Sequence, residues 1–374
     1  MTYWRLSGFY FFYFASLGAL IPYWGLYLKS LGYGAVQIGE LVAIIMATKI
    51  VAPNIWGWIA DRSGQHMRIV RITSFLAAVT FAGILLNQQY AWLVFVMLLF
   101  SFFWNAALPQ FEVTTLNALG DDTHGYSKIR LWGSIGFILT VAALGPVIEQ
   151  TGAEQLPVTI LLLFCGIWLA SLLVPEQKTP QQQSASEPIG QLLHKPAVIS
   201  LLLVCFLLQA SHGPYYTFYS LYLTSHGYSE SAVGQLWALG VLAEIVVFLR
   251  MHRWLPAYGA RSLLMIATCL TACRWIMIGL FVDYPLLITL AQLLHAASFG
   301  VYHAVAIFLI HRHFNGRHQG KGQALYSSLS FGAGGAIGSF AAGYLWEGIG
   351  AEWMFFIAAS VALAAMVVSW KYIE

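Results

Sequence analysis

Apolar stretches of roughly 20 residues, separated by short polar turns, recur along the whole chain. At about 1.5 Å per residue, a helix of that length crosses the ~30 Å hydrocarbon core of a bilayer. We place twelve such stretches, each predicted to be one transmembrane helix: 5–28, 36–59, 68–87, 90–118, 128–149, 156–174, 197–224, 229–249, 261–282, 284–312, 322–345 and 351–371. The pattern therefore predicts an all-α membrane protein with twelve transmembrane helices.

The polar turns between these stretches repeat along the chain. The segment Tyr27–Tyr33 (Tyr-Leu-Lys-Ser-Leu-Gly-Tyr) recurs 195 positions later as Tyr222–Tyr228 (Tyr-Leu-Thr-Ser-His-Gly-Tyr). Two further pairs follow the same repeat, with a spacing that drifts from 195 to 198: Gly64 with Gly259, and the Gly-Ala-Glu triplets that begin at Gly152 and Gly350. The repetition predicts two pseudo-symmetric six-helix bundles, 1–174 and 197–374. The Gln-, Ser- and Pro-rich stretch 175–196 is predicted to be a cytoplasmic linker.

Composition supports the membrane assignment, and the distribution of charge predicts the orientation of the chain in the membrane. The chain is 59% hydrophobic and 9% charged, whereas soluble domains are about 25% charged. Of its 18 Lys and Arg residues, 15 fall on one side of the predicted helices: Arg5, Arg62, Arg68, Arg71, Lys128, Arg130, Lys178, Lys195, Arg250, Arg253, Arg261, Arg312, Arg317, Lys321 and Lys371. Of the other three, only Lys29 lies on the opposite side, and Lys49 and Arg274 lie within the stretches. Because basic loops stay in the cytoplasm, both termini are predicted to be cytoplasmic.

Several classes of protein and site are not supported. The four cysteines lie in apolar stretches and are predicted to be small buried hydrophobes without disulfides. The apolar first 28 residues lack a cleavage motif, and we interpret them as a retained helix. We find no metal-binding cluster, phosphate-binding loop or hydrolase motif, which predicts no metal, no cofactor and no nucleic-acid partner. A membrane-embedded enzyme is therefore disfavoured.

Two opposite charges flank the turn between the fourth and fifth stretches. Glu112 follows Pro109 in the motif Pro-x-x-Glu, and Arg130 begins the motif Arg-x-x-Gly. Ionised side chains in a membrane tend to pair or to face a watery cavity, although these two could also simply rim the cytoplasmic end. The stretch resembles the lactose permease and its oligosaccharide:proton symporter relatives. The resemblance implies that Glu112 and Arg130 form a substrate-binding pair.

A second motif lies between the second and third stretches. It reads Gly57-Trp-Ile-Ala-Asp61-Arg62-Ser-Gly64 and resembles the cytoplasmic loop signature of the major facilitator superfamily, Gly-x-x-x-Asp-Arg/Lys-x-Gly. Asp61 can cap the next helix or pair with Arg62 or another base. The resemblance implies a conformational latch. It also implies the superfamily's architecture of two six-helix halves related by an axis along the membrane normal.

A lysine lies deep in the second stretch. Lys49 stands twelve residues before Asp61, about 18 Å along a helix. We predict that it attracts an anionic substrate or tunes a proton site; the alternative is a structural partner for a nearby acid.

Three ionisable residues lie well inside stretches of the C-terminal half: Glu244, Arg274 and His295. An acid, a base and an imidazole on adjacent helices suit proton transfer, although a single His would more often be a core residue. Trp132, Tyr215 and Trp237 are candidates to stack on a substrate ring. The Gly213-Pro214 step is predicted to interrupt its helix.

These stretches carry a closer resemblance. Leu208–Tyr216, Gly227–Gly234 and Leu236–Glu244 are similar to the 3-phenylpropionate permease group, a branch close to the oligosaccharide and nucleoside:proton symporters. The resemblance implies a proton symporter of the bacterial inner membrane, with Arg274 and His295 in its proton-coupling network. Two departures are Ser298 and Val241, which stand where the lactose permease has acids. Glu244 is therefore predicted to be the replacement acid.

The predicted function is proton-coupled import of a small organic solute, such as the aromatic carboxylate phenylpropionate, by alternating access. A sugar or nucleoside:proton symporter is the alternative within transport, and a transporter-like membrane sensor is the alternative of another class. The expected partners are the small-molecule substrate, protons and the lipid bilayer, and the chain is expected to be a monomer.

Overall fold

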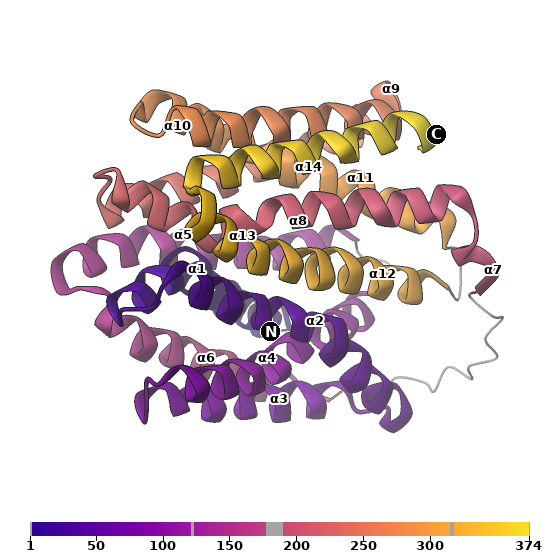
Figure 1. Ribbon diagram of the computed structural model, residues 1–374. Coiled ribbons are helices and arrows are strands. Elements are labelled where there is room, and N and C mark those ends of the chain that lie inside the picture. The colour runs from indigo at the N-terminus through magenta and orange to yellow at the C-terminus, as the bar shows by residue number, and fades with distance from the viewer. Residues whose placement is uncertain (1, 121–122, 177–189, 315–317, 374) are drawn as a thin grey trace. The chain divides into compact units, whose positions relative to one another are not determined.

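The computed structural model describes residues 2–120, 123–176, 190–314 and 318–373, and the elements assigned in these ranges are all helices (Figure 1). Helices of the first half are α1 (Thr2–Ser30), α2 (Ala35–Ser63), α3 (His66–Ala82), α4 (Tyr90–Leu119), α5 (Thr123–Thr151) and α6 (Leu156–Leu172), with the short turns η1 (Gly83–Leu85) and η2 (Ala153–Gln155). Most of the predicted 175–196 linker, residues 177–189, lies outside the described residues.

The second half continues the helical pattern. Its elements are α7 (Gly190–Leu193), α8 (Pro196–Ser225), α9 (Glu230–Leu280), α10 (Pro285–Leu293), η3 (Ala296–Val301), α11 (Tyr302–His313), α12 (Gln319–Ser327), η5 (Ser328–Gly334), α13 (Gly335–Ile349) and α14 (Ala351–Tyr372). Both η3 and η5 are π-helical, so each inserts one wide turn into a longer helix.

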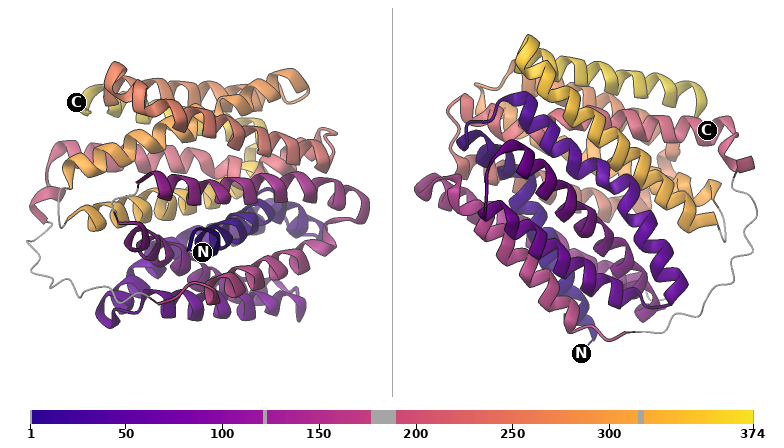
Figure 2. Two further views of the ribbon diagram at one scale, coloured as in Figure 1. Left: turned by 180° about the vertical axis from the view of Figure 1, so that it is seen from behind. Right: turned by 60° about the horizontal axis from the view of Figure 1, so that its bottom comes forward.

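The chain divides into two compact units that do not follow the halves of the sequence strictly. Unit 1 comprises residues 1–33, 47–183 and 229–235, and unit 2 comprises residues 34–46, 184–228 and 236–374. In unit 1, α1 packs against α5 and α6, and α3 packs against α4 and α6. In unit 2, α8 packs against α13 and α14, which lie beside it in Figure 1 and in the right-hand view of Figure 2.

Ten helices of the described chain are long and apolar enough to cross a membrane. This number differs from the predicted twelve at two places. The stretches 229–249 and 261–282 join into α9, but Gly259 inside it has a non-helical backbone (φ 76°). The predicted helix 322–345 is divided by η5 into α12 and α13, each shorter than a bilayer requires.

The internal repeat is visible in the backbone. Seven glycines of the described chain have positive φ, a conformation that costs glycine little. Six of them form three repeat-related pairs: Gly32 with Gly227, Gly64 with Gly259, and Gly152 with Gly350. The repeated residues therefore form the same kind of turn in both halves.

The predicted interruption at Gly213-Pro214 is wrong. The helix α8 runs from Pro196 to Ser225 with Pro214 inside it. A Cβ on Gly213 would meet the Gly338 main chain at 2.1 Å, so the glycine permits close packing of α8 on α13. Close contact between two membrane helices requires small residues, so Gly213 serves the packing of α8 and does not interrupt it.

Two carboxylates lie at the starts of helices in repeat-related positions. In unit 1, Glu149 Oε2 accepts two hydrogen bonds from Ser231 at the start of α9. One comes from the Ser231 amide, at 3.3 Å, and the other from the Ser231 hydroxyl. In unit 2, Glu347 Oε2 accepts a hydrogen bond from the Val36 amide at the start of α2, at 3.4 Å. Each acid partners backbone N–H groups that the helix itself leaves unsatisfied and complements the positive end of the helix dipole.

Candidate functional site

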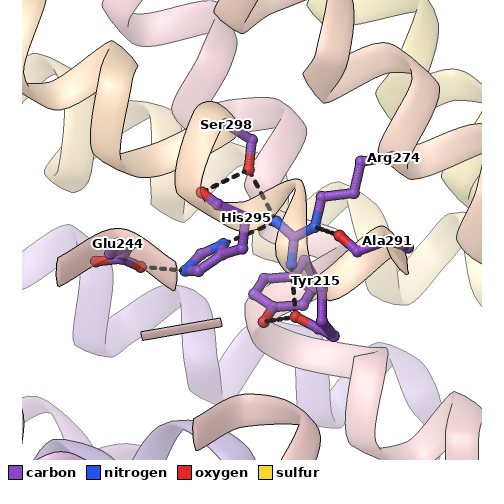
Figure 3. A network of polar contacts seen from close by, with 7 residues as sticks. Tyr215, Glu244, Arg274, Ala291, His295 and Ser298 are labelled. Carbon is purple, nitrogen blue, oxygen red and sulfur yellow. Dashed lines mark hydrogen bonds and ion pairs between the residues drawn. The ribbon is translucent and has the colours of Figure 1, made fainter. Parts of the chain in front are cut away.

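The guanidinium of Arg274 lies at the centre of a buried polar network in unit 2 (Figure 3). It donates to the Ala291 carbonyl at 3.1 Å, to Gln292 Oε1 at 3.1 Å and to Ser298 Oγ at 3.0 Å. Its planar fork matches several acceptors at once, which an ammonium group cannot do in the same way. The base is therefore fixed in position rather than free to move toward solvent.

The same guanidinium sets the hydrogen bonding of His295. Arg274 Nη1 lies 2.8 Å from His295 Nδ1, and because arginine has only donors, Nδ1 must accept. The proton of a neutral imidazole then resides on Nε2, which lies 2.5 Å from Glu244 Oε1. The three side chains thus form one directed chain in which Arg274 donates to His295 and His295 donates to Glu244.

Two predicted substrate-stacking residues belong to this buried network. Tyr215 is fully buried, its ring lies 4.0 Å from the Arg274 guanidinium carbon, and its hydroxyl donates to Gln292 Oε1 at 3.1 Å. Trp237 packs on Tyr215 with ring centroids 4.5 Å apart and donates its indole N–H to Ser220. Tyr215 therefore lies against the base, and Trp237 packs against Tyr215.

The structure places Glu112 and Arg130 in unit 1, on α4 and α5, where both are half-buried. It records no direct ion pair between these two described residues. The Arg130 guanidinium carbon lies 3.9 Å from the centre of the Phe14 ring and 5.7 Å from that of Tyr10. A cation over aromatic faces is stabilised by their quadrupoles, so Arg130 is held by α1 rather than by Glu112.

Lys49 and Trp132 lie on α2 and α5 of the same unit. Lys49 is half-buried at the midpoint of α2, beside Thr48, which bonds Ser101 and Asn105 of α4. Trp132 donates its indole N–H to the Tyr3 hydroxyl at 2.8 Å near the start of α1.

The latch motif forms the junction between α2 and α3. Gly64 has φ 66°, and Asp61 Oδ1 lies 3.7 Å from His66 Nε2 rather than capping α3. Arg62 lies over the Trp58 ring, with 5.4 Å between guanidinium carbon and ring centre. Gly57 faces Gln110, whose side chain bonds His66 at 2.9 Å.

Several supporting residues were not anticipated. Glu176 accepts from the amides of Met67 and Arg68, at 3.0 and 2.8 Å, and so caps α3 in place of Asp61. Gln292 and Ser298 complete the partners of Arg274. Neither role has a sequence motif, although a polar residue in an apolar stretch is a signal. No cluster of three or more metal-ligating side chains occurs within the described ranges.

Comparison with known proteins gives one consistent class. The chain matches the MFS_1 like family over residues 3–357. It is 31% identical over 374 residues to a protein of Escherichia coli (strain K12) named probable 3-phenylpropionic acid transporter, covering 98% of this chain and 96% of that protein. It is 25% identical to the maltose permease of Geobacillus stearothermophilus, covering 93% of this chain and 89% of the permease.

A solved structure agrees with the fold. The crystal structure of a mutant of the nucleoside transporter NupG aligns over 100% of both chains, with a TM-score of 0.89 at 17% identity. At that identity the likeness shows the fold alone. The named relatives and this structural neighbour are transporters and not enzymes.

Proposed function

The chain belongs to the MFS_1 like family, and on that premise we propose that it is a proton-coupled symporter that imports a small organic carboxylate by alternating access. The substrate class that we infer is an aromatic carboxylate such as a phenylpropionate. The proposed arrangement is twelve membrane crossings in two six-helix bundles of a monomer, in a bacterial inner membrane, with both termini cytoplasmic. The observation that carries the proposal is the buried chain of contacts from Arg274 through His295 to Glu244.

The geometry favours Glu244 as the group that carries the proton. A coupling group must accept a proton in one state and release it in another. His295 is a poor acceptor in this arrangement, because Nδ1 already accepts from Arg274 and Nε2 already bears a proton. Glu244 accepts from His295, and its carboxylate can take up a proton while the Arg274–His295 and His295–Glu244 contacts persist.

Charge supports an anionic substrate. Three bases, Lys49, Arg130 and Arg274, and two acids, Glu112 and Glu244, are the charged residues proposed for substrate binding and proton coupling. This set carries one net positive charge, and protonation of Glu244 adds a second. Charge in an apolar surrounding requires compensation, and a bound carboxylate supplies a negative charge that a neutral solute lacks. We propose Arg130 and Lys49 as the bases that bind the carboxylate, and Tyr215 and Trp237 as residues that position Arg274.

The printed name of the Escherichia coli relative favours the same substrate class. A sugar or nucleoside substrate is the second candidate, because the chain is also similar to a maltose permease and shares the fold of a nucleoside transporter. A neutral sugar would not compensate the added positive charge. The two candidates therefore differ in the electrostatics that they require.

The test is uptake into proteoliposomes that contain the purified protein. An inside-alkaline pH gradient is expected to drive accumulation of radiolabelled 3-phenylpropionate, and a protonophore is expected to abolish it. Maltose and uridine are measured in the same vesicles. Accumulation of either neutral solute without the carboxylate would overturn the substrate class, and carboxylate accumulation that survives the protonophore would overturn proton coupling.

A further inference from the structure

Three aromatic rings form a column along one membrane segment of unit 2. His295, Phe299 and His303 follow one another at intervals of four residues. Their ring centroids are 5.8 and 5.6 Å apart in order, with interplanar angles of 17° and 8°. Phe299 therefore lies between two nearly parallel imidazoles. A phenyl ring has no hydrogen-bond donor or acceptor, so it separates the polar groups on its two sides.

The imidazole beyond Phe299 belongs to its own chain of hydrogen bonds. His303 Nδ1 lies 2.8 Å from the Tyr326 hydroxyl, which donates to the Tyr302 hydroxyl at 3.5 Å. Tyr302 contacts Ser330 Oγ at 2.8 Å and donates to the Cys205 carbonyl at 3.4 Å. A tyrosine hydroxyl has one proton, and Tyr326 donates its proton to Tyr302, so Tyr326 accepts from His303 Nδ1. The second ring nitrogen, Nε2, is then the basic one.

Two π-helical segments hold the separating ring. Phe299 lies in the middle of η3, and Phe331 lies in the middle of η5. The two phenyl rings are 6.2 Å apart, and Phe331 is also 6.0 Å from the His303 ring. A π-helical turn costs stability relative to α-helix and is frequent at functional sites. Here both turns place a phenyl ring beside the imidazole column.

We propose that Phe299 is a proton barrier, which prevents a proton on Glu244 from reaching His303 except during the transport cycle. The proposal rests on the proposed function, since it takes Glu244 as the acid that holds the proton. Proton transfer requires groups in hydrogen-bond reach or joined by water, and the Phe299 ring lies between the two imidazoles, 5.8 Å from one and 5.6 Å from the other. A symporter with an open path between them would dissipate the proton gradient without moving substrate.

The leak that the barrier prevents has a defined path. If the phenyl ring is removed, water occupies its place between the polar groups above and below. The proton breaks its bond to the Glu244 carboxyl oxygen and passes along the water to His303 Nε2, which leaves a carboxylate and an imidazolium. The imidazolium then releases its proton to water toward the His313 end of α11, and the neutral ring is restored.

The test is proton permeability without substrate. Purified variants are placed in proteoliposomes with an entrapped pH-sensitive dye, and a valinomycin-clamped potassium gradient drives protons inward. Phe299→Ala is expected to raise the proton flux at least tenfold, whereas Phe299→Leu, which keeps an apolar plug, is expected to remain tight. Phe331→Ala is the comparison, because Phe331 contacts Phe299 and His303 without lying between the two imidazoles, and it is expected to leak less than Phe299→Ala. Adding His303→Gln to Phe299→Ala is expected to restore tightness.

Substrate exchange across the membrane checks that each variant is folded. Wild-type flux in a folded Phe299→Ala, equal fluxes in Phe299→Ala and Phe331→Ala, or a leak unchanged by His303→Gln would each overturn the barrier. Addition of Glu244→Gln separates this proposal from the previous one. If Glu244→Gln abolishes the proton leak of Phe299→Ala, the result supports both the barrier at Phe299 and the role of Glu244 as the proton-carrying acid. A persisting leak that still requires His303 supports the barrier and rejects Glu244 as the acid that supplies the proton.

Discussion

Arg274 determines which nitrogen of His295 faces Glu244. Its Nη1 donates to Nδ1 at 2.8 Å, so Nε2 carries the ring proton and contacts Glu244 Oε1 at 2.5 Å. The imidazole is therefore an oriented donor, and a change at either end of the chain alters the middle.

Glu244→Gln is expected to abolish accumulation driven by a pH gradient while retaining exchange of labelled for unlabelled substrate. Glutamine resembles the protonated acid permanently, so the coupling group no longer cycles. The measurement is uphill uptake and counterflow of the same substrate in proteoliposomes. Glu154→Gln, at an exposed position in η2, is the control. Full accumulation by Glu244→Gln would return attention to Glu112 as the coupling acid.

Arg274→Lys is expected to reduce coupled uptake at least tenfold although it keeps the charge. An ammonium cannot reach Ala291, Gln292 and Ser298 together with His295, and a lost charge-assisted hydrogen bond costs about 1.5–3 kcal/mol. The measurement is initial coupled uptake, with thermal unfolding of the same samples to report stability. If the lysine variant transports at the wild-type rate, the fork geometry of the guanidinium is not required.

Arg130→Lys is expected to raise the half-saturating concentration of the carboxylate about tenfold, since roughly 1.4 kcal/mol corresponds to a factor of ten. Lysine loses both the planar fork and the stacking on Phe14. Glu112→Gln is expected to have a smaller effect, because the structure shows no direct ion pair. Lys128→Arg, at an exposed position two residues earlier, is the control. Unchanged affinity in both Arg130→Lys and Glu112→Gln would show that the two side chains do not bind the substrate and only lie at the cytoplasmic end of their helices.

Glu176→Ala is expected to lower the free energy of unfolding by about 1 kcal/mol, because the amides of Met67 and Arg68 lose their acceptor at the start of α3. Exchange measured below the unfolding temperature is expected to change little. Thermal unfolding in detergent is the measurement, and Glu154→Ala is the matched removal of an exposed acid. Equal unfolding temperatures for the two variants would show that the cap does not stabilise the helix.

Much of the helical architecture follows from periodicity. Apolar stretches long enough to cross a bilayer locate the helices, and the repeated glycines locate the turns, because a positive φ strongly selects glycine. The pattern fails where tertiary packing decides. Pro214 is accommodated inside α8, and the π-helical turns η3 and η5 leave the hydrophobic pattern nearly unchanged while they shift which face each residue occupies.

Some residues of the candidate site could be identified from the sequence, and others could not. Glu244, Arg274 and His295 stand out because charge is rare in apolar stretches, and the structure brings these three together; their role in coupling stays a prediction. Gln292 and Ser298 could not be identified, since neutral polar residues are common in membrane helices and their partners depend on rotation of the helix. Glu176 was missed for another reason: a cap supplied from 109 residues away has no local signature.

The chain from Arg274 to Glu244 also has an electrical consequence. It bears one positive and one negative charge, so it is neutral when the acid is ionised. A proton and a monocarboxylate that bind together add no net charge to the protein. The loaded and empty carriers then respond alike to membrane voltage, whose work is about 2.3 kcal/mol per charge at 100 mV. A pH gradient would drive uptake and voltage alone would not, whereas a proton carried with a neutral sugar would generate a current.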